Sequence, residues 1–210
     1  MRPDAFISDD LQKALHLSQA VMERLTIYHS LLLKWQKSIN LVSDSTLDEA
    51  WHRHFYDSAQ ILTYFPEDAR VCADLGSGAG FPGLVLAILN RDLNMNLIES
   101  DERKCLFLRT VSRETETDVS IHNERIERVT DSFVPDVVTA RAFADLSKIL
   151  DLCSVWIRKN NRLQLILLKG EKADEEIAAA RTRFSFSVES FPSLTHPPAS
   201  ILCLRNLACE

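Results

Sequence analysis

Apolar residues recur every three or four positions over the first 35 residues of the chain. They are Leu11, Ala14, Leu15, Val21, Met22, Leu25, Tyr28, Leu32 and Trp35. This spacing predicts a helix with one buried face, and Ser8 is placed to cap its N-terminus. A second helix is predicted up to Pro66, because Thr46 and Glu49 have the spacing of a capping box. Residues 1–66 therefore form a predicted N-terminal helical region.

Beyond this region the pattern changes to short apolar runs that alternate with segments of helical period. Strands are predicted at residues 70–76, 93–99, 118–123, 135–142, 163–169, 186–191 and 200–206. Helices are predicted between the first five strands, at about 82–90, 102–115, 125–131 and 145–158. Apolar strands without alternation are typical of a parallel sheet covered by helices on both faces. We predict an α/β fold in which residues 67–210 form one compact unit, and in which the last two strands complete the sheet as a hairpin.

Length and composition limit the class of protein. With 210 residues, 46% of them hydrophobic, the chain can bury one sizeable core. No run approaches the roughly 18 apolar residues of a membrane span, and the N-terminus lacks the apolar stretch of a secretory signal, so we expect a soluble, cytoplasmic protein. The five cysteines have no ligand spacing, so we expect no metal site. A net charge of −6 argues against nucleic acid covering the whole surface and leaves a local basic patch open.

Four of the five glycines lie within eight residues, in the turn after the first predicted strand. In a parallel sheet this turn is the usual cofactor site. The dinucleotide fingerprint needs a glycine where the chain has Phe81, and the lysine and hydroxyl residue that end a Walker loop are absent. The remaining pattern, Asp74 followed by G-x-G-x-G, resembles the loop of S-adenosylmethionine-dependent methyltransferases. Glycines there let the backbone approach a nucleoside and an amino-acid tail closely.

A second carboxylate supports this interpretation. Glu99 ends the next predicted strand, 23 residues after Gly76. A carboxylate at that strand tip accepts hydrogen bonds from both ribose hydroxyls of a nucleotide or an adenosyl group. An NAD-dependent oxidoreductase and a non-catalytic RNA-binding module remain as alternatives, as does a methyltransferase with a small-molecule or protein acceptor. Tight binding of NAD in calorimetry, with no binding of S-adenosylmethionine, would favour the oxidoreductase.

Six segments occur in a characteristic order, LLLKWQKSINLVS, WHRHFYDS, DLGSGAGFPG, ESDERKCLFLR, ARAFADL and LLKG. With them nearly the whole chain resembles the bacterial 16S ribosomal RNA guanine-N7 methyltransferases, also called glucose-inhibited division protein B. The resemblance implies a Rossmann-like class I S-adenosylmethionine-dependent methyltransferase fold. It also implies methyl transfer to N7 of a guanine in 16S rRNA, within the small ribosomal subunit or its precursor. We expect a monomer with no membrane partner.

The resemblance also implies the site residues. The cofactor would lie against Gly76, Gly78, Phe81, Glu99, Ile126, Glu127 and Arg141. Glu99 would bind the ribose, although aspartate is expected to be commoner at this position, and Ile126 and Glu127 would contact the adenine. Arg141, at the tip of the fourth predicted strand, is the candidate catalytic residue, because it would face both the cofactor and the acceptor. Guanine N7 carries no proton, so no general base is expected.

Basic residues suggest where RNA lies. The predicted contacts are Arg53, His54, Arg109 and Lys169. In WHRHFYDS, His54 and Asp57 are three residues apart on one helix face and could form a hydrogen bond, but no nucleophile accompanies them. We therefore interpret this segment as a brace between the helical region and the cofactor side of the sheet, with Arg53 or His54 free to contact RNA.

Overall fold

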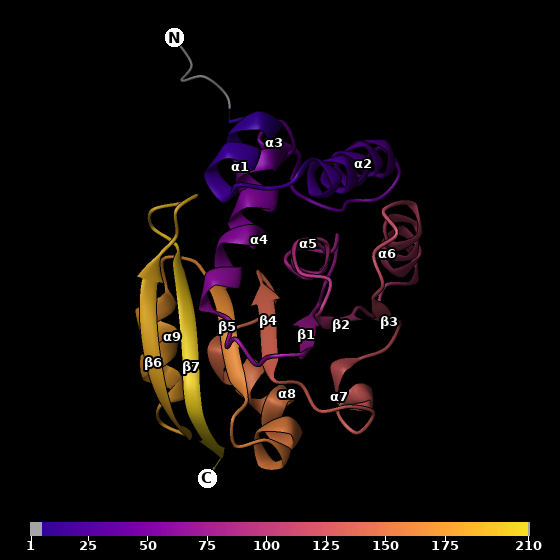
Figure 1. Ribbon diagram of the computed structural model, residues 1–210. Coiled ribbons are helices and arrows are strands. Elements are labelled where there is room, and N and C mark those ends of the chain that lie inside the picture. Colours follow the sequence, from indigo (N-terminus) through magenta and orange to yellow (C-terminus); the bar gives the residue numbers. More distant parts are fainter. Residues whose placement is uncertain (1–5, 210) are drawn as a thin grey trace.

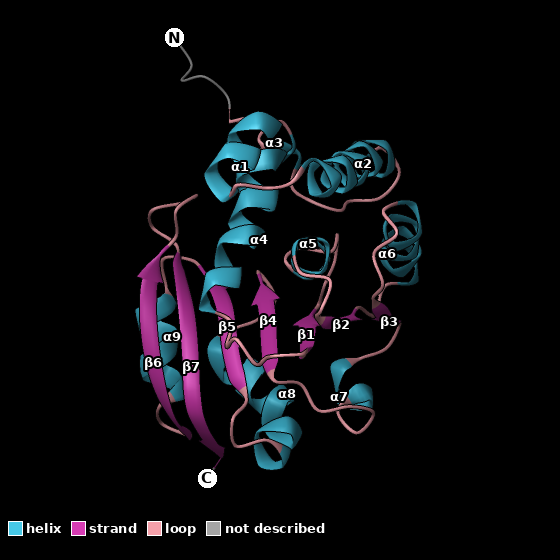
Figure 2. Cartoon of the chain, in the orientation of Figure 1, coloured by secondary structure: helices cyan, strands magenta, loops and turns pink. Residues whose placement is uncertain are grey.

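The computed structural model describes residues 6–209, which form a sheet with helices on both faces (Figure 1, Figure 2). The strands are β1 (Val71–Leu75), β2 (Asn94–Ile98), β3 (Ser120–His122), β4 (Val137–Arg141), β5 (Gln164–Lys169), β6 (Phe184–Pro192) and β7 (Ser200–Cys209). Their order in the sheet is β3-β2-β1-β4-β5-β7-β6. The pairs among β1 to β5 are parallel, and β7 is antiparallel to both β5 and β6. The predicted parallel sheet with a terminal hairpin is confirmed.

The central strands are buried on both faces, which explains why they show no alternation in the sequence. In β1, for example, Cys72 belongs to one hydrophobic core and Ala73 to the other. Residues of α2 (Gln19–Gln36), α5 (Gly83–Leu89) and α6 (Glu102–Glu114) build the first core. Residues of α7 (Ile126–Val129), α8 (Leu146–Lys159) and α9 (Ala173–Ala180) build the second.

The N-terminal helical segment begins with two helices where the sequence predicts one. After α1 (Ser8–Leu15), the chain turns at His16, which has a left-handed φ of 51°, and α2 begins after its cap, Ser18. Ser8 is a helical residue rather than a cap, and Asp10 instead accepts a hydrogen bond from the backbone N–H of Ile7 at 2.9 Å. The break is hidden in the sequence because both helices bury apolar residues in the same core.

The predicted second helix is also divided. The short helix α3 (Asp44–Leu47) is followed by a π-helical turn (Trp51–Tyr56), α4 (Asp57–Ala59) and a 3₁₀ turn (Gln60–Tyr64). Thr46 does not cap a helix, because its hydroxyl donates to the carbonyl oxygen of Ser43 at 2.9 Å and lies 2.9 Å from Nε2 of His54. Figure 1 shows these N-terminal helices gathered at the end of the sheet towards which β4 points. Among the described helices, none has the length and apolar character needed to cross a bilayer.

Candidate cofactor and acceptor site

The loop of residues 76–83 leaves β1 at the carboxyl edge of the parallel strands. Gly76 and Gly78 have left-handed backbone conformations, with φ angles of 62° and 56°. A Cβ atom on Gly76 would lie 2.3 Å from the ring of Phe143, so this position requires glycine for packing. A Cβ atom on Gly78 would come no closer than 3.7 Å to its nearest neighbour, the carbonyl oxygen of Gly76. Gly78 therefore presents bare backbone to open space, where a ligand can lie against it.

Asp74 supports this loop from beneath. Its carboxylate accepts hydrogen bonds from the Gly83 backbone N–H at 3.2 Å and from the Thr139 hydroxyl at 2.9 Å. Burial raises the pKa of Asp74 to about 6, although the hydrogen bond from Thr139 acts in the opposite direction. Because the side chain is fully buried, Asp74 holds the loop to β4 and to the start of α5 instead of facing a ligand.

Glu99 lies directly after β2 and faces the glycine loop. One carboxylate oxygen accepts a hydrogen bond from the backbone N–H of Gly78 at 2.9 Å, and the other accepts one from the N–H of Asp101 at 2.8 Å. A carboxylate oxygen can accept more than one hydrogen bond, so Glu99 keeps acceptor capacity for hydroxyl groups. The two backbone contacts fix the carboxylate at the mouth of the loop.

Two cavities open at this edge of the sheet. The smaller one, which we call the acidic pocket, has a volume of about 330 Å³, and the larger one, the arginine pocket, has a volume of about 490 Å³. The two share the lining residues Gly76, Gly78, Lys104 and Ala142. The glycine loop therefore borders both cavities, so a ligand that lies along the loop would contact both.

The structure brings most of the predicted site residues together around these cavities. Glu99, Ile126 and Glu127 line the acidic pocket. Phe81, Arg141, Arg53, His54 and Lys169 line the arginine pocket. Arg109 lies apart from both, exposed on α6. The Lys169 amine is directed away from open solvent, because it pairs with Glu176 at 2.7 Å and donates to the carbonyl oxygen of Ala144.

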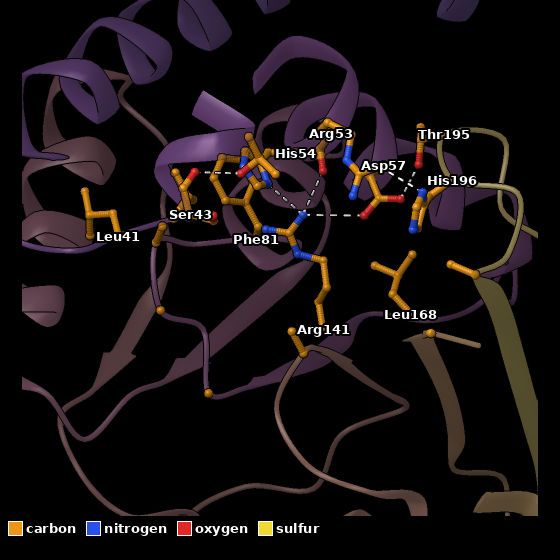
Figure 3. A pocket seen from close by; sticks show the side chains of 18 of the residues that line it. Leu41, Ser43, Arg53, His54, Asp57, Phe81, Arg141, Leu168, Thr195 and His196 are labelled. Atoms are coloured by element: carbon orange, nitrogen blue, oxygen red, sulfur yellow. Dashed lines mark hydrogen bonds and ion pairs between the residues drawn. The ribbon is translucent and has the colours of Figure 1, made fainter. Parts of the chain in front are cut away.

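Arg141 is the centre of the arginine pocket (Figure 3). Its Nη1 atom lies 3.1 Å from the carbonyl oxygen of Arg53, 3.0 Å from Nδ1 of His54 and 3.4 Å from Oδ2 of Asp57. The guanidinium also lies 5.0 Å from the centroid of the Phe81 ring. Burial lowers the pKa of Arg141, and the neighbouring Asp57 carboxylate opposes that shift. Within the described chain, His54 and Asp57 thus meet at Arg141 rather than in the hydrogen bond that their spacing suggested.

The protonation of His54 follows from its partners. An arginine can only donate, so Nδ1 of His54 accepts from Arg141 and the ring proton lies on Nε2, towards the Thr46 hydroxyl. Burial, together with repulsion from Arg141 and Arg53, lowers the pKa of His54 to about 3. The ring is therefore neutral near pH 7. Only 7% of the residue is exposed, which leaves little of it to face RNA.

Replacing His54 with glutamine is expected to make the protein less sensitive to acid. A glutamine amide can still accept from Arg141 and donate to Thr46. The folded His54 has a pKa of about 3 and the unfolded one about 6.5, so its stabilising contribution is complete above pH 6.5 and is lost as pH falls towards 3. Between pH 7 and pH 5, wild type should lose about 2 kcal/mol more unfolding free energy than His54→Gln, measured by urea denaturation. Equal losses in the two proteins would contradict this assignment.

The segment between β6 and β7 completes the wall of the arginine pocket. Asp57 Oδ1 accepts hydrogen bonds from the side chains of Thr195, Ser193 and Gln60. His196 lies 2.9 Å from a guanidinium nitrogen of Arg53, atom Nδ1 to Nη1. Sequence reasoning missed these hydroxyl residues. No local pattern indicates that a segment near residue 195 contacts a helix near residue 57.

Comparisons with known proteins agree on one family. The profile of the family described as rRNA small subunit methyltransferase G matches residues 21–202. The ribosomal RNA small subunit methyltransferase G of Rhodospirillum centenum is 45% identical over 204 residues, which cover 97% of this chain and 93% of the relative. The protein of the same name from Rhodospirillum rubrum is 45% identical over 207 residues, covering 99% and 98%.

Two solved structures share the fold. The O-methyltransferase TomG from Streptomyces achromogenes, in complex with S-adenosylmethionine, superposes with a TM-score of 0.61 at 11% identity, covering 98% of this chain and 99% of that one. A ribosomal protein L11 methylase from Lactobacillus delbrueckii superposes with a TM-score of 0.54 at 14% identity, covering 71% and 76%. At such low identity these likenesses show the fold alone, a Rossmann-like class I methyltransferase fold.

Proposed function

The chain belongs to the rRNA small subunit methyltransferase G family, and we propose that it transfers a methyl group from S-adenosylmethionine to N7 of a guanine in 16S rRNA. Membership of this family makes it an S-adenosylmethionine-dependent methyltransferase of ribosomal RNA. The observation that carries the proposal is the family match over residues 21–202, together with a glycine loop that borders two adjacent pockets. We further propose that it acts in the cytoplasm as a monomer, on the small subunit or its precursor.

The residues around the glycine loop fit an adenosyl cofactor. Gly78 offers open space above its backbone, and Glu99 is fixed beside it, which supports the proposal that Glu99 accepts hydrogen bonds from the ribose hydroxyls. Phe81 occupies the position at which the dinucleotide fingerprint needs a glycine, which argues against NAD. Ile126 supplies an apolar surface for the adenine. When bound, S-adenosylmethionine supplies an electrophilic methyl group on a positively charged sulfur.

The chain's own contribution to the reaction is mainly positioning. Guanine N7 has a lone pair and no proton, so no side chain has to remove a proton before it attacks. His54 agrees with this, because its Nδ1 is occupied by Arg141 and its pKa is about 3. We propose that Arg141 orients the acceptor or the cofactor carboxylate through its free N–H groups. It would not stack its charge on the purine, because methylation makes that ring cationic.

We propose that the two parts of the chain have different functions, one in binding the cofactor and one in binding the acceptor. Residues 67–209 form the methyltransferase unit that holds the cofactor, and residues 6–66 cover the acceptor side. Arg53 lines the arginine pocket and Arg109 is exposed on α6, which supports the proposal that both contact RNA. His54 and Lys169 are nearly buried and support the pocket wall from within.

Small ribosomal subunits are expected to accept methyl groups far better than free guanosine. Base positioning should come from folded RNA and its bound proteins, because proteins recognise RNA largely through its shape and its unstacked bases. The test incubates the enzyme with labelled S-adenosylmethionine and subunits from cells that lack it, followed by nuclease digestion and mass spectrometry. Equal transfer to free guanosine would contradict the proposed substrate, and a methyl group on an atom other than N7 would contradict the proposed acceptor.

A further inference from the structure

Asp57 lies where three distant parts of the chain meet. Its side chain is only 14% exposed. It accepts hydrogen bonds from residues of the helical segment, of β4 and of the segment between β6 and β7. Its two oxygens are divided between these parts. Oδ2 faces Nη1 of Arg141, whereas Oδ1 accepts from Gln60 at 3.0 Å, from Ser193 at 3.4 Å and from Thr195. Figure 3 shows this carboxylate between Arg141 and Thr195.

Arg141 is held by one edge of its guanidinium. All three of its hydrogen bonds to described residues use Nη1, and they leave Nη2 and Nε without a partner in that part of the chain. Two of the three partners, the Arg53 carbonyl group and the neutral ring of His54, carry no charge. Asp57 is therefore the partner that supplies a negative charge to a guanidinium whose side chain is only 18% exposed.

We propose that Asp57 is a positioning residue for the methyl transfer, which anchors the Nη1 edge of Arg141 so that Nη2 and Nε face the arginine pocket. A fork of two N–H groups suits two acceptor oxygens of RNA or of the cofactor carboxylate. The same carboxylate ties Arg141 to the segment between β6 and β7, so the acceptor-side wall and the guanidinium move together. This inference rests on the proposed function, because it takes Arg141 as the group that meets the reactants.

The substitution that tests this is Asp57→Asn. The asparagine oxygen can still accept from Ser193 and Thr195, while its amide group, which cannot pair with a cation, replaces the charge beside Arg141. A displacement of about 1 Å at a positioning group can cost roughly a hundredfold in rate, so we expect a tenfold to hundredfold lower single-turnover rate on pre-bound subunits. The matched control is Ser193→Ala, which removes a neutral donor from the other oxygen and keeps the ion pair. It should lower thermal stability with much less effect on the rate.

A double-mutant cycle separates positioning from a general loss of structure. If Asp57 acts through Arg141, the protein carrying both Asp57→Asn and Arg141→Ala should be no slower than Arg141→Ala alone. Rate losses that multiply would overturn the inference, because they would show that Asp57 acts independently of Arg141.

A second measurement needs no methylation at all. In nitrogen-resolved NMR spectra of the arginine side chains, Arg141 of the cofactor-free wild type should give separate signals for its two Nη groups, because the anchored edge restricts rotation. In Asp57→Asn these signals should merge, and in Ser193→Ala they should stay separate. Unchanged Arg141 signals in Asp57→Asn would overturn the inference. A wild type that methylates no small-subunit RNA would instead overturn the proposed function, and the spectra would still decide the role of Asp57.

Discussion

Gly78→Val is expected to abolish binding of S-adenosylmethionine while the protein still folds. Gly78 has a φ of 56°, and a β-branched residue in this region carries a strain of about 1–3 kcal/mol. The protein itself leaves room for a Cβ atom, whose nearest contact would be 3.7 Å away. The valine side chain would therefore project into the pocket space beside the loop, which Gly78 lines in both pockets, and the strained backbone would disturb the hydrogen bond from Gly78 N–H to Glu99. Isothermal calorimetry measures the binding.

Gly170→Val is the matched control for this experiment. Gly170 lines the arginine pocket but not the acidic pocket, its φ is not in the left-handed region, and a Cβ atom there meets nothing within 4 Å. A valine at this position therefore adds no backbone strain and leaves the glycine loop and its hydrogen bond to Glu99 unchanged. The control should bind S-adenosylmethionine with an affinity close to that of wild type, and urea denaturation should show that both variants fold. Normal binding of S-adenosylmethionine by Gly78→Val would show that the glycine loop is not part of the cofactor site.

The strands could be predicted from the sequence because burial on both faces leaves a direct signal. Runs such as Val137–Arg141 and Gln164–Lys169 are buried at nearly every position, so their apolar residues follow one another without alternation. The helix α9 was missed because its sequence, ADEEIAAA, has no large apolar residue that is buried, and only Ala173 and Ala180 are buried. A helix that buries two alanines leaves a weak apolar period.

The helix boundaries of the N-terminal segment could not be predicted from the sequence, for a different reason. Leu11 and Leu25 pack into the same core, so the apolar period continues across the break at His16. The π-helical turn at Trp51–Tyr56 changes which backbone groups bond, and it leaves the order of apolar and polar residues unchanged. No periodicity argument can detect a widened turn of this kind.

Some pocket residues could be placed from the sequence, and others could not. Glu99 and Arg141 could be placed from the sequence because each follows or ends a predicted strand, and strand ends of a parallel sheet lie at one edge. The partners of Asp57 could not be predicted from the sequence, because local spacing suggested His54 as its partner. Its actual partners, Arg141 and Thr195, are 84 and 138 residues away along the chain. Only the tertiary structure brings them together.

Arg141→Ala is expected to reduce the single-turnover rate of methylation by roughly a hundredfold or more. The substitution removes a guanidinium that lies over the Phe81 ring and lines the arginine pocket. It also leaves the Asp57 carboxylate without its cationic partner, so stability should fall as well. The rate is measured with saturating labelled donor on pre-bound subunits, at a temperature where circular dichroism shows the variant folded. A rate within threefold of wild type would exclude a role in positioning.

Arg141→Lys separates charge from geometry. Lysine keeps the positive charge beside Asp57 but has no planar fork, so it cannot donate from two fixed directions at once. Because the acceptor ring gains positive charge during transfer, a cation by itself should not accelerate the reaction, and the lysine variant should remain nearly as slow as the alanine variant. Recovery of the rate in Arg141→Lys would show that charge is what Arg141 supplies.

The wild-type rate of methylation should stay nearly constant from about pH 7 to pH 8. In this range N7 carries no proton, His54 stays neutral, and the pH lies above the pKa of about 6 of Asp74. A rate that rises across this range as one group titrates would point to a general base and away from N7 as the acceptor.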